Sequence, residues 1–330
     1  MISQAPLLDE EEEEAVVELS LTRVVPAECA GLRADLALGR LFPEYSRSRI
    51  QSWMREERVL VNAQAIGVRA KVWEGDVVDI PPPPDLNEDE VLPENIPLKL
   101  VYQDEGIFVV HKPAGLVVHP GSGNRSGTLQ NGLLFMDAAL SKVPRSGIVH
   151  RLDKDTSGLM VVARTLPVHT DLVRQLQARS VKRHYAAIAV GEIANDGVVN
   201  APIGRHPAQR TKMAVVADGR PAITHYAIQE HLKGFTRVEC RLETGRTHQI
   251  RVHMQKLGFP LVGDPVYGVS VARVKTFPEV AQVFSRQALH AFRLGLIHPL
   301  THIPMEWEIA LEPDFQTLLD GLRASKNASP

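Results

Sequence analysis

The stretch GIVHRLDKDTSGLMVVAR, residues 147–164, joins a dense polar cluster to an apolar run. The cluster, residues 150–157, holds one His, one Arg, one Lys, one Thr, one Ser and two Asp. The run 159–163 is typical of a buried strand, and Gly147 and Gly158 bracket the cluster as a tight loop before a strand requires. Most charged clusters are solvated loops, but carboxylates beside cations at the mouth of a strand are typical of an active site.

Nine residues of this stretch, HRLDKDTSG (150–158), resemble the active-site motif of the RluA/RluC/RluD family of RNA pseudouridine synthases, which isomerise uridine in RNA. The resemblance extends over nearly the whole chain from about residue 19. RHPAQRTKMAV (205–215) and RPAITHY (220–226) favour the RluD subgroup, whose members act on large-subunit ribosomal RNA. Five further segments resemble other motifs of the family: KPAGLVVHPG (112–121), VKRHYAAIAVG (181–191), RLETGRTHQIRVH (241–253), GDPVYG (263–268) and LHAFRLGLIHP (289–299).

The composition of the 330-residue chain fits a soluble globular protein, because 44% of its residues are hydrophobic and no apolar run approaches the length of a membrane span. The N-terminus has no basic stretch followed by an apolar one, so we expect no secretory signal. Cys29 and Cys240 are far apart and in no metal-like spacing. This cysteine usage fits a reducing compartment, and we expect a cytoplasmic protein.

Charge is distributed unevenly along the chain, although the net charge is only −2. Residues 1–14 carry six acids and no Lys or Arg. Residues 96–330 carry 28 Lys and Arg against 19 Asp and Glu, a balance of +9. A basic body suits a polyanionic partner such as RNA, although +9 over 235 residues is modest.

These patterns predict four parts of the chain. Residues 1–18 form an acidic leader that we expect to be disordered. Residues 19–81 form a small domain, residues 82–95 a linker rich in proline and acids, and residues 96–330 the catalytic domain.

The small domain, with the layout GLRADLALGRLFPEYSRSRIQ…VLVN…GD, resembles the S4 RNA-binding domain. After Pro43 we expect a helix capped by Ser46 or Ser48, with Ile50, Trp53 and Met54 on its apolar face. The resemblance implies that outward-facing arginines of this segment contact RNA, namely Arg47, Arg49, Arg55 and Arg58. A plain small α/β domain with a charged surface is the alternative.

The remainder of the chain reads as short strands punctuated by helices. We expect strands at 107–111, 159–163, 184–190, 236–242 and 305–309, and a helix over 168–176. Thr247 is expected to cap a helix that Gly258 ends. This irregular order predicts an α+β fold with an antiparallel sheet. The family resemblance implies a mixed, mainly antiparallel central sheet with flanking helices.

The resemblance implies that Asp153, Tyr185 and Arg251 carry the reaction in a deep cleft. Asp153 attacks as a nucleophile or takes a proton from the sugar on a route through a glycal, and the sequence leaves both routes open. By the same resemblance, Arg251 is the cation expected to face this carboxylate. Tyr185 stacks on the target base, and its hydroxyl is suited to moving a proton at C5. Without the motif, Arg251 would read as a surface charge and Tyr185 as a core residue.

Further side chains near these motifs are expected to bind substrate: His150, Arg151, Lys112, Arg246 and His248. Arg151 would hold a phosphate or fill the vacated base stack, and a salt bridge to its neighbour Asp153 is the alternative. The histidines show no metal-ligand spacing, and the chain has no nucleotide-binding glycine motif, so we expect neither metal nor cofactor.

We therefore expect a monomeric isomerase that acts on uridines of large-subunit ribosomal RNA, in the stem-loop that faces the decoding region. Three alternatives stay open. The protein could act on other rRNA or tRNA uridines, or it could be a non-catalytic rRNA-binding assembly factor. It could also be a glycosyl hydrolase that uses Asp153 and Asp155 as paired carboxylates.

Overall fold

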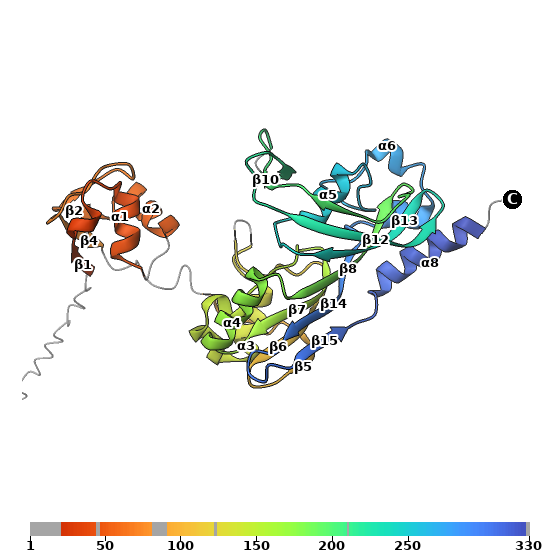
Figure 1. Cartoon of the computed structure of the whole chain (residues 1–330), viewed down its shortest axis with the longest axis horizontal. Helices are drawn as coiled ribbons and strands as arrows, with labels where there is room; N and C mark the ends of the chain where they lie inside the picture. The colour runs from red at the N-terminus through yellow and green to blue at the C-terminus, as the bar shows by residue number, and fades with distance from the viewer. Residues whose placement is uncertain (1–20, 44–46, 81–90, 122–123, 210, 328–330) are drawn as a thin grey trace, which may run out of the picture. The chain divides into compact units, whose positions relative to one another are not determined.

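The computed structural model describes residues 21–43, 47–80, 91–121, 124–209 and 211–327, without the side chains of residues 48, 49 and 327. The chain divides into two compact units, Met1–Glu90 and Val91–Pro330 (Figure 1). The expected acidic leader, the cap at Ser46 and residues 82–90 of the expected linker lie outside this description. The alternative cap at Ser48 is wrong, because Ser48 lies within the helix Arg47–Arg55. No helix in the described ranges combines the length and apolar character needed to cross a bilayer.

In the described residues, the smaller unit is a four-stranded antiparallel sheet with two α-helices and one 3-10 turn. Ile50, Trp53 and Met54 are buried in its core at 0%, 6% and 3% exposure, as the helical pattern predicts. The strands follow the order β1 (Leu21–Val24), β4 (Val77–Ile80), β2 (Leu60–Val61) and β3 (Gln64–Ala65). The helices are η1 (Ala27–Cys29), α1 (Ala34–Leu41) and α2 (Arg47–Arg55).

A buried carboxylate, Asp35 of α1, ties the two helices of the smaller unit together. It accepts hydrogen bonds from Arg47 Nη2 at 2.6 Å, Gln51 Nε2 at 2.8 Å and Arg33 Nε at 3.1 Å. Burial on its own would raise the pKa of Asp35, but these donors outweigh burial and lower it. The charge of Asp35 is therefore compensated by side chains of its own unit.

The larger unit is built on a nine-stranded mixed sheet. The strands follow the order β5 (Lys99–Gln103), β6 (Ile107–Lys112), β7 (Ser157–Ala163), β14 (Leu289–Ile297), β8 (Lys182–Val190), β13 (Phe235–Leu242), β12 (Ile223–Leu232) and β9 (Gly197–Asn200), with β15 (Pro304–Glu308) also on β14. Of the described pairings in this sheet, β7 with β14 is parallel and the others are antiparallel. Strands β10 (Ile203–Arg205) and β11 (Met213–Val215) form a separate hairpin.

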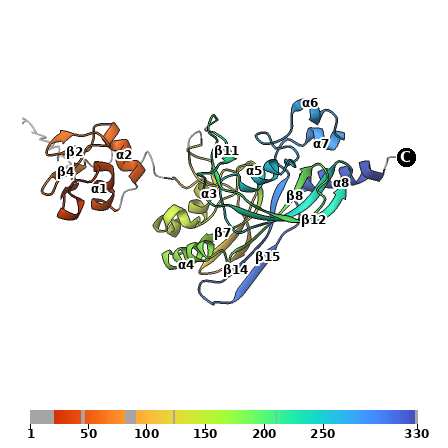
Figure 2. The ribbon, with the colours of Figure 1, turned by 45° about the horizontal axis from the view of Figure 1, so that its top comes forward.

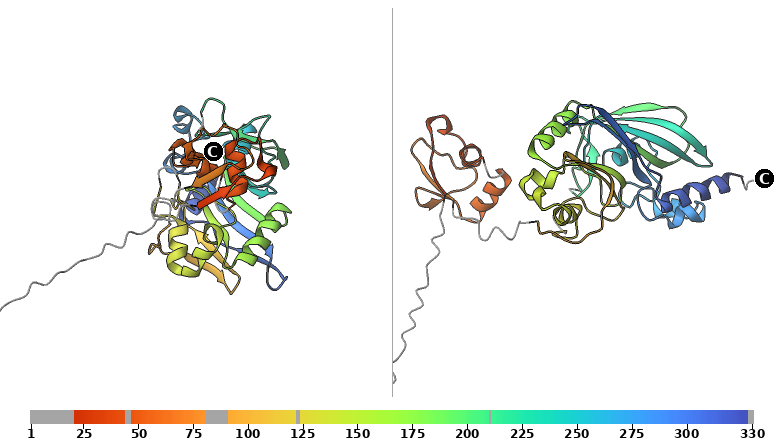
Figure 3. Two further views of the ribbon diagram at one scale, coloured as in Figure 1. Left: turned by 90° about the vertical axis from the view of Figure 1, so that its left-hand side faces the viewer. Right: turned by 90° about the horizontal axis from the view of Figure 1, so that it is seen from below.

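Helices cover both faces of this sheet. Side chains alternate between faces along a strand, so Phe108 of β6 packs with Leu133 and Ile250 on one face. Its neighbour Val109 packs with Leu172 on the other face. The helices are α3 (Leu129–Met136), α4 (Leu166–Gln177), α5 (Gln249–Lys256), α6 (Val271–Val274), α7 (Glu279–Val283) and α8 (Pro313–Asn327), with 3-10 turns η2 (Ala138–Lys142) and η3 (Pro144–Gly147). Helices α4 and α5 lie on opposite sides of the sheet (Figure 2), and α8 lies at the end away from α3 and α4 (Figures 1 and 3).

The segment that follows the division between the units belongs to the larger one. Residues 91–95, part of the expected linker, lie against α3: Asn131 Nδ2 donates to Leu92 O at 2.8 Å, and Glu94 N donates to Asn131 O at 3.1 Å. The larger unit thus begins with a strap over α3 before β5 enters the sheet.

The start of α5 differs from the expectation. Thr247 does not cap this helix, which begins at Gln249 after His248 in a left-handed conformation with a φ of 57°. The side chain of Gln249 organises the loop instead, because its Oε1 accepts from Arg246 N at 3.0 Å and from Thr244 Oγ1 at 2.8 Å. The helix ends before Gly258, which has a φ of 87°.

Two glycines bracket the 147–158 loop for a steric reason. A Cβ on Gly147 would lie 1.9 Å from Ala163 O, and one on Gly158 would lie 2.2 Å from Ala291 O. Both residues also have positive φ angles, 80° and 124°. The loop that carries the polar cluster can therefore join β7 only with glycine at positions 147 and 158.

We expect Gly147→Ala to lower the free energy of unfolding by more than about 3 kcal/mol, because it combines a left-handed backbone with a backbone clash. Gly127→Ala is the matched control: Gly127 has a φ of 68° with nothing within 4 Å of its added Cβ. The control should cost only about 1–2 kcal/mol. Urea titrations of the two variants test this, and equal losses would contradict the steric argument.

Candidate active site

A cavity of about 560 Å³ opens in the larger unit beside the 147–158 loop. The loop before β7, strand β8, the turn after β13 and the start of α5 all contribute to its wall. Two carboxylates, Asp153 and Glu243, lie in this wall. Arginines dominate the charge of the lining: Arg145, Arg151, Arg179, Arg183, Arg246 and Arg251. A cavity with this excess of cations is suited to a polyanion.

The structure brings Asp153 and Arg251 into contact, although they are 98 residues apart. Arg251 Nη1 donates to Asp153 Oδ2 at 3.0 Å. The Asp153 side chain is 16% exposed and that of Arg251 is 5% exposed. The carboxylate therefore faces the cavity, while its cation is held in the wall behind it.

A second carboxylate, Asp264, fixes the guanidinium of Arg251. Arg251 Nε donates to Asp264 Oδ2 at 2.7 Å and Nη2 to Oδ1 at 2.8 Å, a bidentate pair. Burial alone would raise the pKa of Asp264, but Arg251 and the N–H groups of Val266 and Tyr267 outweigh it and lower that pKa. Burial alone would lower the pKa of Arg251, but Asp264 and Asp153 outweigh burial and raise it. Nη1 of Arg251 makes the contact to Asp153.

Sequence reasoning did not assign a role to Asp264. The sequence did contain a signal for it: the segment GDPVYG (263–268) resembles a family motif, and Asp264 is the one acid in that segment. Its turn is tightly built, because a Cβ on Gly263 would lie 2.2 Å from Arg286 O. This turn aims the carboxylate at α5.

His248 lies beside Asp153 in a defined tautomer. The Tyr267 hydroxyl accepts from Met213 N at 2.9 Å, so its own hydrogen is available to His248 Nδ1 at 2.8 Å. The imidazole proton then sits on Nε2, which is 3.9 Å from Asp153 Oδ1. Burial lowers the pKa of His248; Asp153 opposes this and Arg251 adds to it. His248 is thus a neutral ring with its N–H directed toward the carboxylate.

Tyr185 belongs to the wall of the cavity and to the hydrophobic core. It is 5% exposed and packs with Ala187 and Cys240 in the core cluster that reaches Ile250 of α5. Burial raises the pKa of Tyr185 to about 12, with Arg183 opposing the shift and Asp153 adding to it. At neutral pH it is a phenol that presents a ring and a hydrogen-bond donor, not a phenolate base.

Three of the expected substrate-binding residues also line the cavity. Arg151 is exposed, and Arg246 Nε donates to Pro221 O at 3.1 Å. His150 Nε2 accepts from Val161 N at 3.1 Å, and burial lowers its pKa to about 3, so this ring is neutral.

Lys112 is the expected substrate-binding residue that the cavity does not include. Its side chain is fully buried, and Nζ donates to Pro113 O and Leu116 O at 2.8 Å and to Lys154 O at 2.9 Å. These bonds use all three of its donors. Lys112 therefore holds the loop after β6 against the loop that carries Asp153.

The arginines expected to contact RNA from the smaller unit have different environments. Arg47 is engaged by the buried Asp35. Arg55 is exposed and Arg58 is half-buried. The side chain of Arg49 lies outside the described residues.

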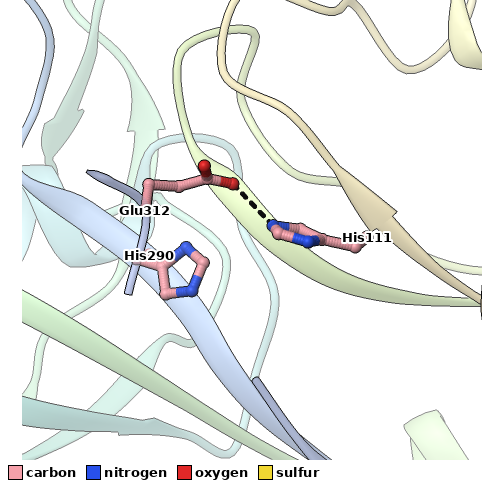
Figure 4. Close-up of side chains that lie close together, drawn as sticks. All are labelled: His111, His290 and Glu312. Carbon is pink, nitrogen blue, oxygen red and sulfur yellow. Dashed lines mark ion pairs between the residues drawn. The ribbon is translucent and has the colours of Figure 1, made fainter. Parts of the chain in front are cut away.

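One group of metal-ligating residue types occurs in the described part of the chain: His111, His290 and Glu312 (Figure 4). His111 Nε2 is 2.6 Å from Glu312 Oε1. His290 Nε2 donates to Ala310 O at 3.1 Å, so its Nδ1 accepts from Ser157 Oγ at 2.8 Å. Burial lowers the pKa of His290 to about 4. Both nitrogens of this neutral ring are used, which leaves no lone pair for a cation.

The neighbouring carboxylate Asp155, the partner required by a paired-carboxylate hydrolase, does not line the cavity. Its backbone oxygen accepts from Arg286 Nη1 at 3.3 Å, on the side of the loop that meets α8. The cavity therefore presents one carboxylate of the DKD segment, Asp153, and not both.

Comparisons with known proteins identify the family. Residues 106–256 match the family of RNA pseudouridylate synthases. The chain is 49% identical to ribosomal large subunit pseudouridine synthase D of Nitrosomonas europaea, over 97% of this chain and 91% of that protein. It is also 49% identical to the protein of the same name from Escherichia coli K12, over 93% of this chain and 95% of that protein.

Solved structures show the same fold for the larger part of the chain. Human RNA pseudouridylate synthase domain containing 1 matches with a TM-score of 0.54 and 25% identity, covering 72% of this chain and 97% of its own. Human RNA pseudouridylate synthase domain containing 4 matches with the same TM-score and 26% identity, covering 68% and 93%. The resemblance seen in HRLDKDTSG is confirmed, and the chain belongs to the RNA pseudouridine synthases, the isomerases that convert uridine to pseudouridine in RNA.

Proposed function

We propose that the substrate of this enzyme is large-subunit ribosomal RNA, in the stem-loop that faces the decoding region. The observation that carries the proposal is the near full-length identity of 49% to relatives named for the ribosomal large subunit. A ribosomal RNA substrate implies a cytoplasmic enzyme, and both cysteines, Cys29 and Cys240, are buried free thiols.

The smaller unit is proposed to bind RNA as an S4-like domain. Its helix α2 buries Ile50, Trp53 and Met54 and leaves Arg55 exposed. Because Arg47 is held by Asp35 and Arg58 Nη1 lies 4.0 Å from Glu56 Oε2, we assign the direct phosphate contact first to Arg55 and give Arg47 and Arg58 a supporting role. Phosphate contacts of this kind position a protein on RNA without reading its bases.

Asp153 is proposed to carry the reaction. The C1′–N1 bond of uridine breaks, the uracil turns, and C1′ joins C5. The hydrogen of C5 leaves as a proton, and N1 gains a proton. Attack by the carboxylate and proton removal from the sugar both require the ionised form of Asp153. Arg251 stabilises that form at 3.0 Å, and Asp264 keeps Arg251 in place.

Tyr185 is proposed to stack on the uracil. A base within a stem is out of reach, so the nucleotide must flip out at a cost of a few kcal/mol. Stacking on an aromatic ring returns about 1–3 kcal/mol. With a pKa of about 12, the Tyr185 hydroxyl acts as a donor to the base. His248 Nε2–H, 3.9 Å from Asp153, orients the carboxylate or a substrate oxygen beside it.

Tritium release from large-subunit rRNA made with [5-³H]uridine tests the function, because joining C1′ to C5 must expel the C5 hydrogen. We expect release with the native enzyme and none with Asp153→Asn. Asp155→Asn is the matched control: it removes the neighbouring carboxylate, which does not line the cavity, and should keep release within about threefold of native.

The same experiment separates the alternatives. Free uracil among the products would indicate a hydrolase. Tight rRNA binding without release, from naked RNA and from assembling subunits alike, would indicate an assembly factor. Release from tRNA in preference to rRNA would overturn the proposed substrate.

Asp264→Asn should lower kcat by about 10- to 100-fold, because a charge-assisted contact that fixes Arg251 is lost. Breaking this buried pair should also lower the free energy of unfolding by about 3 kcal/mol. Binding of rRNA, measured by filter retention, should change little because Asp264 does not line the cavity. Asp320→Asn removes an ion pair whose carboxylate is 57% exposed and should leave all three quantities near native. A native kcat in Asp264→Asn would contradict the positioning role.

A further inference from the structure

Arg183 is a buried cation in the wall of the cavity. It lies on β8 two residues before Tyr185, so both side chains project from the same face of the strand. Arg183 is 7% exposed and lines the cavity. Its Nη2 donates to Glu243 O at 3.2 Å, and its Nε is buried without a hydrogen-bond partner among the described residues.

No carboxylate of the described residues pairs with Arg183, which sets it apart from the other buried arginines. Arg251 pairs with Asp153 and Asp264, and Arg286 pairs with Asp314. Buried charges in proteins are normally paired, because removing an ion from water is costly. Burial lowers the pKa of Arg183.

The two acids of the cavity cannot supply the missing charge. Glu243 accepts from Arg179 Nη1 at 2.8 Å and from His225 Nε2 at 2.7 Å. Asp153 is turned to Arg251 at 3.0 Å. An anion for Arg183 must therefore enter the cavity from outside the described residues.

The side of Arg183 that an anion can reach is the side that lines the cavity. The turn after β13 passes the guanidinium at Gly245, where an added Cβ would lie 2.7 Å from Arg183 Nη1. Gly245 therefore packs its bare backbone against the guanidinium and brings no acidic side chain to it. In RNA the full negative charges are the phosphodiesters, whereas uracil offers only neutral carbonyl oxygens.

We propose that Arg183 is a phosphate-binding residue, whose guanidinium pairs with a phosphodiester adjoining the uridine that is flipped against Tyr185. The inference rests on the proposed RNA substrate and names how the cavity holds it. The cation anchors the backbone of the extruded nucleotide while the ring two residues along the strand holds its base. Phosphate pairing places the nucleotide, and the sequence of the RNA is read elsewhere.

Neutralising one phosphate at a time tests the pairing. The probe is the rRNA stem-loop to which tritium release maps, with a methylphosphonate 5′ or 3′ of the target uridine. The ribose preceding each modified position is 2′-O-methylated in the charged and the neutral RNA alike. Affinities are measured in Asp153→Asn protein to prevent turnover. We expect one methylphosphonate to weaken binding by about 10- to 100-fold.

Arg183→Gln should weaken binding of the charged RNA by the same factor and abolish the further loss on neutralising that phosphate. Arg179→Gln is the matched control, because Arg179 lines the same cavity but already pairs with Glu243. It should retain the sensitivity to the methylphosphonate. An Arg183→Gln protein that stays sensitive at both positions would overturn the inference, and would point to a contact with the base.

The thermal stability of an Arg183 variant distinguishes phosphate binding from a purely structural role of this side chain. Because the free protein gains no ion pair from Arg183, Arg183→Met should unfold at the same or a higher temperature than native. A fall of more than 5 °C would assign the side chain to the fold and overturn the inference. Should Arg183→Gln fail to fold, Arg183→Lys serves in its place, with the sensitivity to one methylphosphonate reduced at least threefold.

These outcomes are distinct from failure of the proposed function. An enzyme that releases no tritium from any rRNA contradicts the substrate assignment. An enzyme that releases tritium, but whose Arg183 variants lose the same factor with charged and neutral RNA, contradicts only the phosphate contact.

Discussion

The bidentate pair between Arg251 and Asp264 is the contact on which the geometry of the active site depends. It joins α5 to the turn after it and orients the guanidinium so that Nη1 donates to Asp153. Without Asp264, Arg251 would be a long side chain with several rotamers and a large entropy to lose on meeting a carboxylate. With Asp264 in place, that entropy is lost on folding rather than on binding substrate. The enzyme therefore meets its RNA with the cation already placed.

The sheet supplies the second constraint. Strand β14 runs parallel to β7 only at His290–Ser157 and Ala291–Gly158, directly after the loop that carries Asp153. The absence of a side chain at Gly158 lets the two backbones approach, and Lys112 fixes the same loop from the β6 side through Lys154 O. The backbone of the loop is thus held by β14 and by Lys112, which leaves the side chain of Asp153 to face the cavity.

The sequence allowed the family, the strands around the motif and the buried face of α2 to be predicted, because each leaves a local pattern. The site required more than local patterns. The motif pointed to Asp153, Tyr185 and Arg251, but nothing near Lys112 shows that its ammonium turns inward to three carbonyls. Likewise, Arg47 reads as a surface charge until Asp35 is folded against it. Whether Arg183 has an acidic partner is a property of the tertiary structure, since every candidate acid lies far along the chain. Thr247 failed as a cap because α5 begins one residue later, after His248 in a left-handed conformation.

Tyr185 belongs both to the cavity wall and to the hydrophobic core, and this limits which substitutions the position can accept. Its ring faces the cavity and also packs in the main core with Ala187 and Cys240. A substitution that reshapes the base-binding surface at this position must also refill the volume behind it, which close-packed interiors tolerate poorly. New substrate preferences should therefore arise more readily at the exposed arginines of the cavity, Arg145, Arg151 and Arg179, than at Tyr185. These exposed positions can change while the buried base-binding surface stays the same.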